Sequence, residues 1–192
     1  MNFINLFSYP ILVTEISLNL RELENYCLNL QENSNGRIKS NMYGWQSEDI
    51  KGEVPELNEL LINIEEHSQK FFDFMQFKEN LIPYISNLWI NINPTNSYNT
   101  IHSHDGAILS GVYYVKGNDK SGNIVFTNPC DINLFPSNIN RFNEHNSLTY
   151  FEIPKAGKFL LFPGYMKHYV DMNTSDESRI SISFNINYTE PV

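Results

Sequence analysis

The stretch Arg179-Ile-Ser-Ile-Ser-Phe-Asn-Ile-Asn-Tyr188 alternates apolar and polar side chains. Successive side chains of a β-strand point to opposite faces, so this period of two predicts a strand with one aliphatic face and one polar face. An upstream stretch, Leu88-Trp-Ile-Asn-Ile-Asn93, repeats the pattern. The polar set across the two predicted strands is Trp89, Asn91, Asn93, Arg179, Ser181, Ser183 and Asn185.

The two faces of these strands need different neighbours. Two amphipathic helices are predicted over residues 20–30 and 55–75, where apolar side chains recur at helical spacing and Pro55 stands at a first turn. These helices need an apolar sheet face to cover, and the aliphatic set is the natural one. The polar set would then line the inside of a ligand-holding barrel. The alternative is a sandwich whose polar face lies in water.

The rest of the pattern divides the chain into a helical front, residues 1–83, and a strand-rich back, residues 84–192. Residues 11–16 read as a short extended segment, and residues 33–47, rich in Gly, Asn and Ser, are expected to be a loop. A chain of 192 residues usually makes one domain, so we expect residues 1–192 to be a single, mainly β domain with flanking helices. Turn-forming segments separate further predicted strands at residues 109–116, 123–127, 148–153, 158–163 and 168–170.

Charge, cysteine content and hydropathy indicate which partners and which compartment to expect. The formal net charge of −9 repels nucleic acid and anionic membranes, so we expect neither as a partner. Cys27 and Cys130 are isolated in the sequence, which is typical of reduced thiols rather than of a disulfide. The N-terminus lacks a signal-peptide pattern, and no apolar run approaches the roughly 20 residues of a membrane span. We therefore expect a cytoplasmic protein.

Three histidines are the candidate metal ligands. His102 and His104 stand two residues apart, so on a strand both would point to one face, and His168 lies far downstream. Imidazole suits iron, zinc, copper and nickel, and a face of three protein ligands leaves positions free for substrate and oxygen. His67 lies on the apolar stripe of the second predicted helix and is interpreted as a packed histidine rather than a ligand.

Arg179 is a candidate binding group for a carboxylate beside the metal. Its guanidinium is a fixed fork of donors that matches a carboxylate. An arginine on the inward face of a barrel, without an acidic side chain on that face, requires an anion opposite it. A metal combined with a carboxylate anchor suggests an oxygenase that uses a 2-oxo acid.

At this point the sequence resembles the 2-oxoglutarate and Fe(II)-dependent oxygenases of prolyl-hydroxylase-like type, and more closely a small group of such oxygenases from bacteria and phages. The resemblance covers most of the chain and implies a double-stranded β-helix, a jelly-roll, cupin-like barrel with N-terminal helices packed on the major sheet. It is carried by His102-Ser-His104, Leu109-Ser-Gly-Val-Tyr-Tyr-Val115, Pro154-Lys-Ala-Gly-Lys-Phe-Leu-Leu-Phe-Pro163 before His168, Arg179-Ile-Ser-Ile-Ser-Phe-Asn185, and Ser40-Asn41 with Gly44-Trp-Gln-Ser47.

The resemblance also implies roles for single residues. His102 and His168 fall on the family's first and distal histidine ligands, and Arg179 with Ser181 falls on the element that holds the distal carboxylate of 2-oxoglutarate. Tyr114 stands where many relatives contact that carboxylate. Asn91 or Asn93 would serve the 1-carboxylate side.

One position departs from the family pattern. Most relatives have His-x-Asp or His-x-Glu, whereas the second position here is His104. Asp105 is adjacent, but it would leave the opposite face of a regular strand unless a bulge brought it round. Three ligand sets remain open, ranked in this order: His102, His104 and His168; a set that uses Asp105; and two histidines with an open position.

The implied activity is a dioxygenase reaction that uses Fe(II), 2-oxoglutarate and O₂. It hydroxylates an unactivated C–H of a peptidyl or small amino-acid-like substrate and releases succinate and CO₂, in a bacterial or phage-infected host cytosol; a homodimer is compatible with the sequence. Residues 40–47 and 128–146 are candidate lids. Two rival classes are a three-histidine zinc or iron cupin-type enzyme that does not use 2-oxoglutarate and a catalytically inactive ligand-binding barrel.

Overall fold

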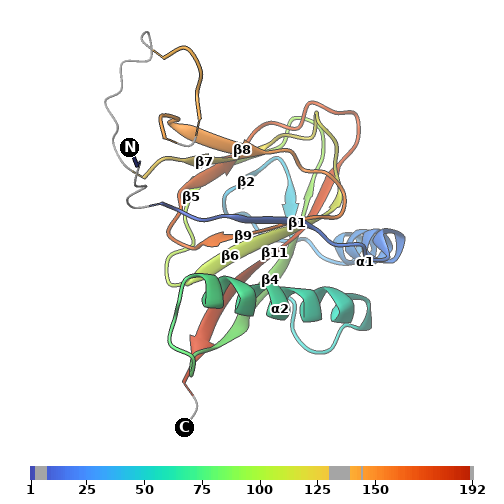
Figure 1. The fold of residues 1–192 in the computed structure, drawn as a ribbon. Helices are drawn as coiled ribbons and strands as arrows, with labels where there is room; N and C mark the ends of the chain where they lie inside the picture. Colours follow the sequence, from blue (N-terminus) through green and yellow to red (C-terminus); the bar gives the residue numbers. More distant parts are fainter. Residues whose placement is uncertain (3–7, 130–138, 144, 191–192) are drawn as a thin grey trace.

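The computed structural model describes residues 1–2, 8–129, 139–143 and 145–190 of the chain (Figure 1). Within this part, antiparallel strands form two sheets. The major sheet has the order β1 (Leu12–Glu15), β9 (Lys158–Pro163), β6 (Leu109–Lys116), β11 (Arg179–Thr189), β4 (Ile82–Asn93) and β3 (Trp45–Gln46). The minor sheet has the order β2 (Asn41–Met42), β5 (Tyr98–His102), β10 (His168–Val170), β7 (Ile124–Thr127) and β8 (Thr149–Glu152).

Two helices cover the outer face of the major sheet, as predicted. Helix α1 (Leu20–Glu32) is capped at its N-terminus by Asn19, whose side-chain oxygen accepts a hydrogen bond from the main-chain N–H of Glu22. Helix α2 (Asn58–Phe74) follows a short 3-10 turn, η1 (Pro55–Leu57), so Pro55 opens that turn rather than the α-helix itself. In Figure 1 both helices lie on the side of the major sheet that faces away from the minor sheet.

The alternation of β4 and β11 sorts their side chains between two environments. The strands pair from Arg179 opposite Asn93 to Thr189 opposite Ile82, with one bulge after Asn185. Their aliphatic set is buried against the helices in the main hydrophobic core. The members of this set are Leu88, Ile90, Ile92, Ile180, Ile182, Phe184 and Ile186.

The other face of the same strands lines a cavity between the two sheets. The cavity has a volume of about 680 Å³, and the whole predicted polar set contributes to its wall. A second cluster of buried apolar residues, including Val112, Phe126 and Phe162, packs inside the barrel beside it. The sandwich alternative is therefore wrong, because the polar face encloses a cavity instead of facing bulk water.

The prediction of a loop over residues 33–47 is wrong in part. Two short strands occur there: β2 pairs with β5 of the minor sheet, and β3 pairs with β4 of the major sheet. The side chain of Asn41 holds the connection, because its amide donates to the carbonyl of Gly44 and its oxygen accepts from the N–H of Lys39. This segment joins the edges of the two sheets on one side of the cavity.

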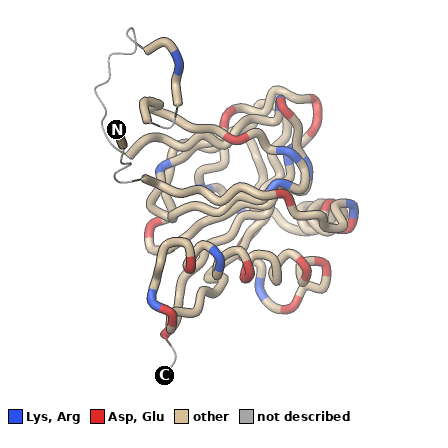
Figure 2. Tube along the Cα trace, in the orientation of Figure 1, with Lys and Arg blue, Asp and Glu red and all other residues tan. Residues whose placement is uncertain are grey.

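Other expectations fall partly outside the described residues. Cys27 is a buried free thiol, whereas Cys130 is not among the residues described. The candidate lid at residues 128–146 is largely outside them as well. In the described part, no helix has the length and apolar character needed to cross a membrane. Figure 2 places most charged residues in helices and loops, while the strands around the cavity consist mainly of other residue types.

Candidate metal and co-substrate site

Strand pairing in the minor sheet brings two of the histidines together. His102 ends β5 and His168 begins β10, and the two residues are direct partners in the antiparallel register. Their ring centroids are 4.4 Å apart. The predicted proximity of these two residues is thus a property of the sheet itself.

His104 reaches the same point for a different reason from the one predicted. Strand β5 ends at His102, so His104 lies in the following loop rather than on the same strand face. Its N–H donates to the carbonyl of Gly164 at 2.8 Å, and a Cβ on Gly164 would lie 2.3 Å from the carbonyl oxygen of Ala107. The loop therefore packs closely on the turn before His168. The ring of His104 stacks on Trp89 and on His168.

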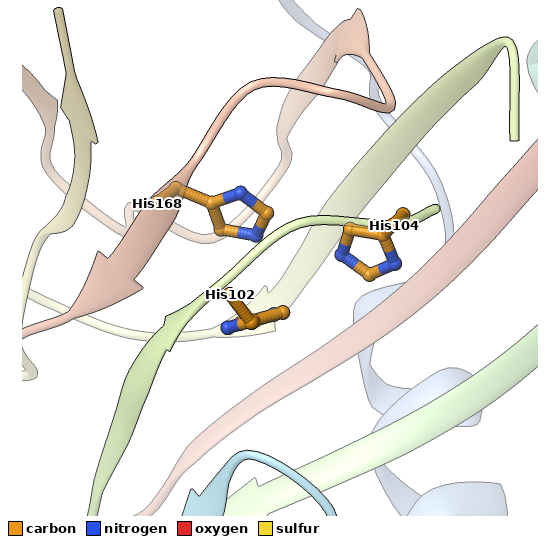
Figure 3. Close-up of side chains that lie close together, drawn as sticks. All are labelled: His102, His104 and His168. Carbon is orange, nitrogen blue, oxygen red and sulfur yellow. The ribbon is translucent and has the colours of Figure 1, made fainter. Parts of the chain in front are cut away.

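The three imidazoles converge (Figure 3). One ligand atom from each of His102, His104 and His168 lies within 4.8 Å of the other two, a spacing that could hold a metal ion. Asp105 does not join them: it is exposed, and its carboxylate accepts a hydrogen bond from the hydroxyl of Ser103.

Main-chain carbonyls orient two of the rings. His102 Nδ1 lies 2.7 Å from the carbonyl oxygen of Thr100, and His168 Nδ1 lies 2.9 Å from that of Met166. A carbonyl can only accept, so Nδ1 carries the proton and Nε2 keeps its lone pair for a ligand bond. This is the usual outer-shell arrangement of a metal-binding histidine.

The histidines are poised in their neutral form. Burial lowers the pKa of all three; together with the neighbouring His102, it lowers the pKa of His104 to about 4 and that of His168 to about 3. A neutral imidazole is the form that binds a metal, so no proton has to be displaced near neutral pH.

Arg179 lies in the wall of the same cavity and is 2% exposed. Its Nη1 donates to the carbonyls of Ser121 and Gly122. Gly122 has a φ of +85°, and a Cβ there would lie 2.1 Å from the carbonyl oxygen of Asp171, so the loop can approach this closely only as glycine.

Within the described part of the chain, Arg179 makes no ion pair, and no Asp or Glu lines the cavity. Asp171 is near enough to attract the guanidinium, although it is not within ion-pair distance. Burial is the main influence on Arg179 and lowers its pKa. A buried guanidinium remains protonated and favours an anion in the cavity.

Further polar groups surround Arg179. Ser181 and Tyr114 line the cavity, are buried, and make no hydrogen bond through their hydroxyls to any described residue. Burial raises the pKa of Tyr114 to about 12, so its phenol is a neutral donor. Among the described residues, neither amide atom of Asn93 has a partner, and Oδ1 of Asn91 also has none.

Sequence reasoning missed part of the cavity wall. Asn87 lies before the predicted start of its strand, although the alternation of residues 89, 91 and 93 extends to it. The segment of Arg37 to Ser40 and the strand residues Asn99 and Thr100 also line the cavity. No local pattern marks these residues, because the pairing of β2 with β5 positions them.

A barrel with a histidine cluster that could hold a metal ion and a buried arginine that favours an anion is the arrangement expected of a metal-dependent oxygenase that uses a 2-oxo acid. A comparison with protein families matches residues 87–185, just over half of the chain, to the family described as "Putative 2OG-Fe(II) oxygenase". The chain belongs to this family. It is thus a 2-oxoglutarate-dependent dioxygenase, in a family that uses Fe(II), 2-oxoglutarate and O₂.

Solved structures share the fold at low sequence identity. A prolyl-4-hydroxylase of Pseudomonas putida is 12% identical, with 93% of each chain covered and a TM-score of 0.66. HygX of Streptomyces hygroscopicus, crystallised with nickel, 2-oxoglutarate and hygromycin B, is 11% identical, with 93% of this chain and 83% of that chain covered and a TM-score of 0.63.

The carbocyclase SnoK of nogalamycin biosynthesis, described as α-ketoglutarate dependent, is 11% identical, with 95% of this chain and 82% of that chain covered and a TM-score of 0.67. A comparison with curated proteins gave no match. The shared fold is the double-stranded β-helix, as the sequence resemblance predicted.

Proposed function

We propose that the protein hydroxylates an unactivated C–H of a peptidyl or small amino-acid-like substrate, with His102, His104 and His168 as the ligands of Fe(II). In the balanced reaction, O₂ supplies one oxygen atom to the substrate and one to succinate, while 2-oxoglutarate loses CO₂. The proposal assigns Arg179, Ser181 and Tyr114 to the distal carboxylate of 2-oxoglutarate.

The observation that carries this proposal is the state of Arg179. A buried guanidinium whose hydrogen bonds go only to two carbonyl oxygens has no ion-pair partner among the described residues, and Asp171 attracts it only from a longer distance. A carboxylate would supply that charge and could also accept from the hydroxyls of Ser181 and Tyr114. Oδ1 of Asn91 and both amide atoms of Asn93 also lack partners among the described residues, and these residues stand opposite Ser181 and Arg179, respectively, in the strand register. We assign them to the same co-substrate.

The donor set also fits iron. Three neutral imidazoles suit Fe(II), and a metal held by three protein ligands would still have room for 2-oxoglutarate and oxygen. The bound metal and co-substrate would supply the oxidising power for C–H cleavage. The chain itself orients His102 and His168 through carbonyl hydrogen bonds, and Trp89 packs against His104. With histidine in place of the family's carboxylate, the site carries one more unit of positive charge.

The cavity is large enough for more than 2-oxoglutarate. A cavity of about 680 Å³ is within the range of small-molecule sites and exceeds what a five-carbon acid fills, so it also suits part of a substrate. A single domain over residues 1–192, a cytosolic location and a homodimer are compatible with this assignment.

Two other classes predict different results from one experiment. The protein is reconstituted anaerobically with Fe(II), its metal content is measured, and succinate is quantified after addition of 2-oxoglutarate, ascorbate and oxygen. We expect bound iron and succinate that depends on both iron and 2-oxoglutarate. A cupin-type zinc enzyme would retain zinc and leave 2-oxoglutarate unchanged, and an inactive barrel would form no succinate with any metal.

A further inference from the structure

A row of polar side chains crosses the major sheet at one end of the cavity. Asn185 of β11 stands directly between Asn87 of β4 and Ser110 of β6 in the strand register, and all three residues line the cavity. None of these side chains carries a charge. The row has no role in the site assigned above to metal and 2-oxoglutarate.

The hydrogen bonds of this row are incomplete. Asn185 donates from Nδ2 to Oδ1 of Asn87 at 2.9 Å, and Ser110 donates to the carbonyl of Phe184. Oδ1 of Asn185 is buried and has no partner in the described part of the chain. Nδ2 of Asn87 donates to no described residue. The pair therefore presents a buried acceptor without a partner beside a donor that is not fully buried, and an unpaired buried amide oxygen is unfavourable.

This row lies level with the histidines and far from Arg179. Phe162, the neighbour of Ser110 in β9, has its ring 5.0 Å from that of His168. Asn185 stands six residues along β11 from Arg179, roughly 20 Å at the rise of an antiparallel strand. The five-carbon chain of 2-oxoglutarate spans only roughly 5 Å, so an acid anchored at Arg179 does not reach the row.

If the function proposed above is correct, the group that meets the row at the level of the metal belongs to the substrate. We propose that Asn87 and Asn185 bind a neutral amide of the substrate, either a carboxamide or a peptide amide. Oδ1 of Asn185 accepts the amide N–H, and Nδ2 of Asn87 donates to its carbonyl. A cation or a carboxylate finds no opposite charge in this row, so the pair selects a neutral group.

The test uses three probes of similar size in which the amide itself is replaced: propanamide, propanoate and propylammonium, which are neutral, anionic and cationic. Each is titrated by calorimetry into protein loaded with 2-oxoglutarate and Ni(II), a redox-inert substitute for Fe(II). We expect the neutral probe to bind tightest. Asn185→Leu, which is similar in size but has no hydrogen-bonding atoms, should weaken its binding roughly tenfold.

Two further variants control for folding and chemistry. Asn187→Leu makes the same change on the same strand at a residue that does not line the cavity, and it should leave probe binding unchanged. Asn185→Asp keeps the shape and the acceptor but adds a negative charge, so it should shift the preference toward propylammonium. This second variant gives a positive signal even if Asn185→Leu fails to fold.

Three results would overturn the proposal: no binding of the neutral probe, equal binding of all three probes, or unchanged binding to Asn185→Leu. Competition between the neutral probe and 2-oxoglutarate would also overturn it, since the row would then belong to the co-substrate site. Failure of the proposed function would appear separately, as a wild-type protein that does not bind 2-oxoglutarate at all.

Discussion

Strands β4 and β11 each have two faces with opposite chemistry. On one face, Ile90, Ile182 and Phe184 are fully buried against the helices. On the other face, Asn91, Arg179 and Ser181 are almost as well buried, yet Oδ1 of Asn91 and both amide atoms of the neighbouring Asn93 have no partner among the described residues. Burial alone therefore does not distinguish the two faces.

The difference lies in what each buried group needs. The aliphatic face is complete within the chain, since its side chains contact one another and the helices. The polar face contains the Arg179 guanidinium and the amides of Asn91 and Asn93, whose interactions a bound ligand would complete. Substitutions on the aliphatic face should thus lower stability, and substitutions on the polar face should lower ligand affinity.

The largest expected effect is on the aliphatic face. Phe184→Ala removes a fully buried ring that stacks on Phe159 with centroids 5.5 Å apart, so the free energy of unfolding should fall by about 3–5 kcal/mol. Denaturant unfolding of the metal-free protein measures this loss, and Phe184→Leu should lose less. A loss below about 1 kcal/mol would mean that this face is not the stabilising one.

The next effect is on the polar face. Arg179→Ala should weaken 2-oxoglutarate binding by roughly 2–5 kcal/mol and spare the metal, the cost expected when one partner of a buried charge pair is truncated. Titration of 2-oxoglutarate into the iron-loaded, anaerobic variant measures it. Arg179→Lys keeps the charge but loses the forked donor geometry, so its affinity should be intermediate. Unchanged affinity in Arg179→Ala would remove the main support for the co-substrate assignment.

The third prediction concerns the wall opposite the polar face. His104→Ala should weaken iron binding by about 100-fold or more, above the 10–100-fold typical of losing an outer-shell partner. Asp105→Ala should have little effect, because its carboxylate lies outside the histidine cluster. His67→Ala serves as a histidine control, since that ring packs on Phe159. A larger loss from Asp105→Ala than from His104→Ala would reverse the ligand assignment.

The smallest effects compare two adjacent residues on opposite faces. Ser181→Ala should weaken 2-oxoglutarate binding by about 1 kcal/mol, the typical value of one hydrogen bond, with little change in stability. Ile182→Val should instead lower stability by about 0.5–1.5 kcal/mol and leave 2-oxoglutarate binding unchanged. Calorimetry and denaturant unfolding on both variants test this exchange. If both variants changed the same property, the division into a stability face and a ligand face would be wrong.

The sequence predicted those features that depend on strong local periodicity. The alternation in Arg179–Tyr188 placed the cavity side and the helix side of β11 correctly, and the bounds of β6, β9 and β10 were predicted without error. The family resemblance added the barrel and its class of cofactors. These features were accessible because alternating side chains record which face of a strand is covered.

The features that the sequence did not predict depend on distant pairing. Strands β2 and β3 are each two residues long, with one polar and one apolar residue, so they are too short to show a periodicity and form because β5 and β4 present free edges to them. His104 is similar: its position depends on a hydrogen bond to Gly164, which is 60 residues away. The spacing of His102 and His104 predicted that both residues join His168, and the three do cluster. The spacing placed both on one strand, however, whereas His104 lies in the loop after β5.

The carbonyl hydrogen bonds of His102 and His168 determine which sequence changes the proposed metal site can tolerate. Each ring is oriented by the main chain two residues earlier, at Thr100 and at Met166. A carbonyl oxygen is present whatever the side chain, so substitutions at these two positions leave the tautomer of the ligand intact. Side-chain substitutions at positions 100 and 166 should therefore leave the orientation of the two rings unchanged. Insertions or deletions nearby should disturb it, because they move the carbonyl groups relative to the histidines.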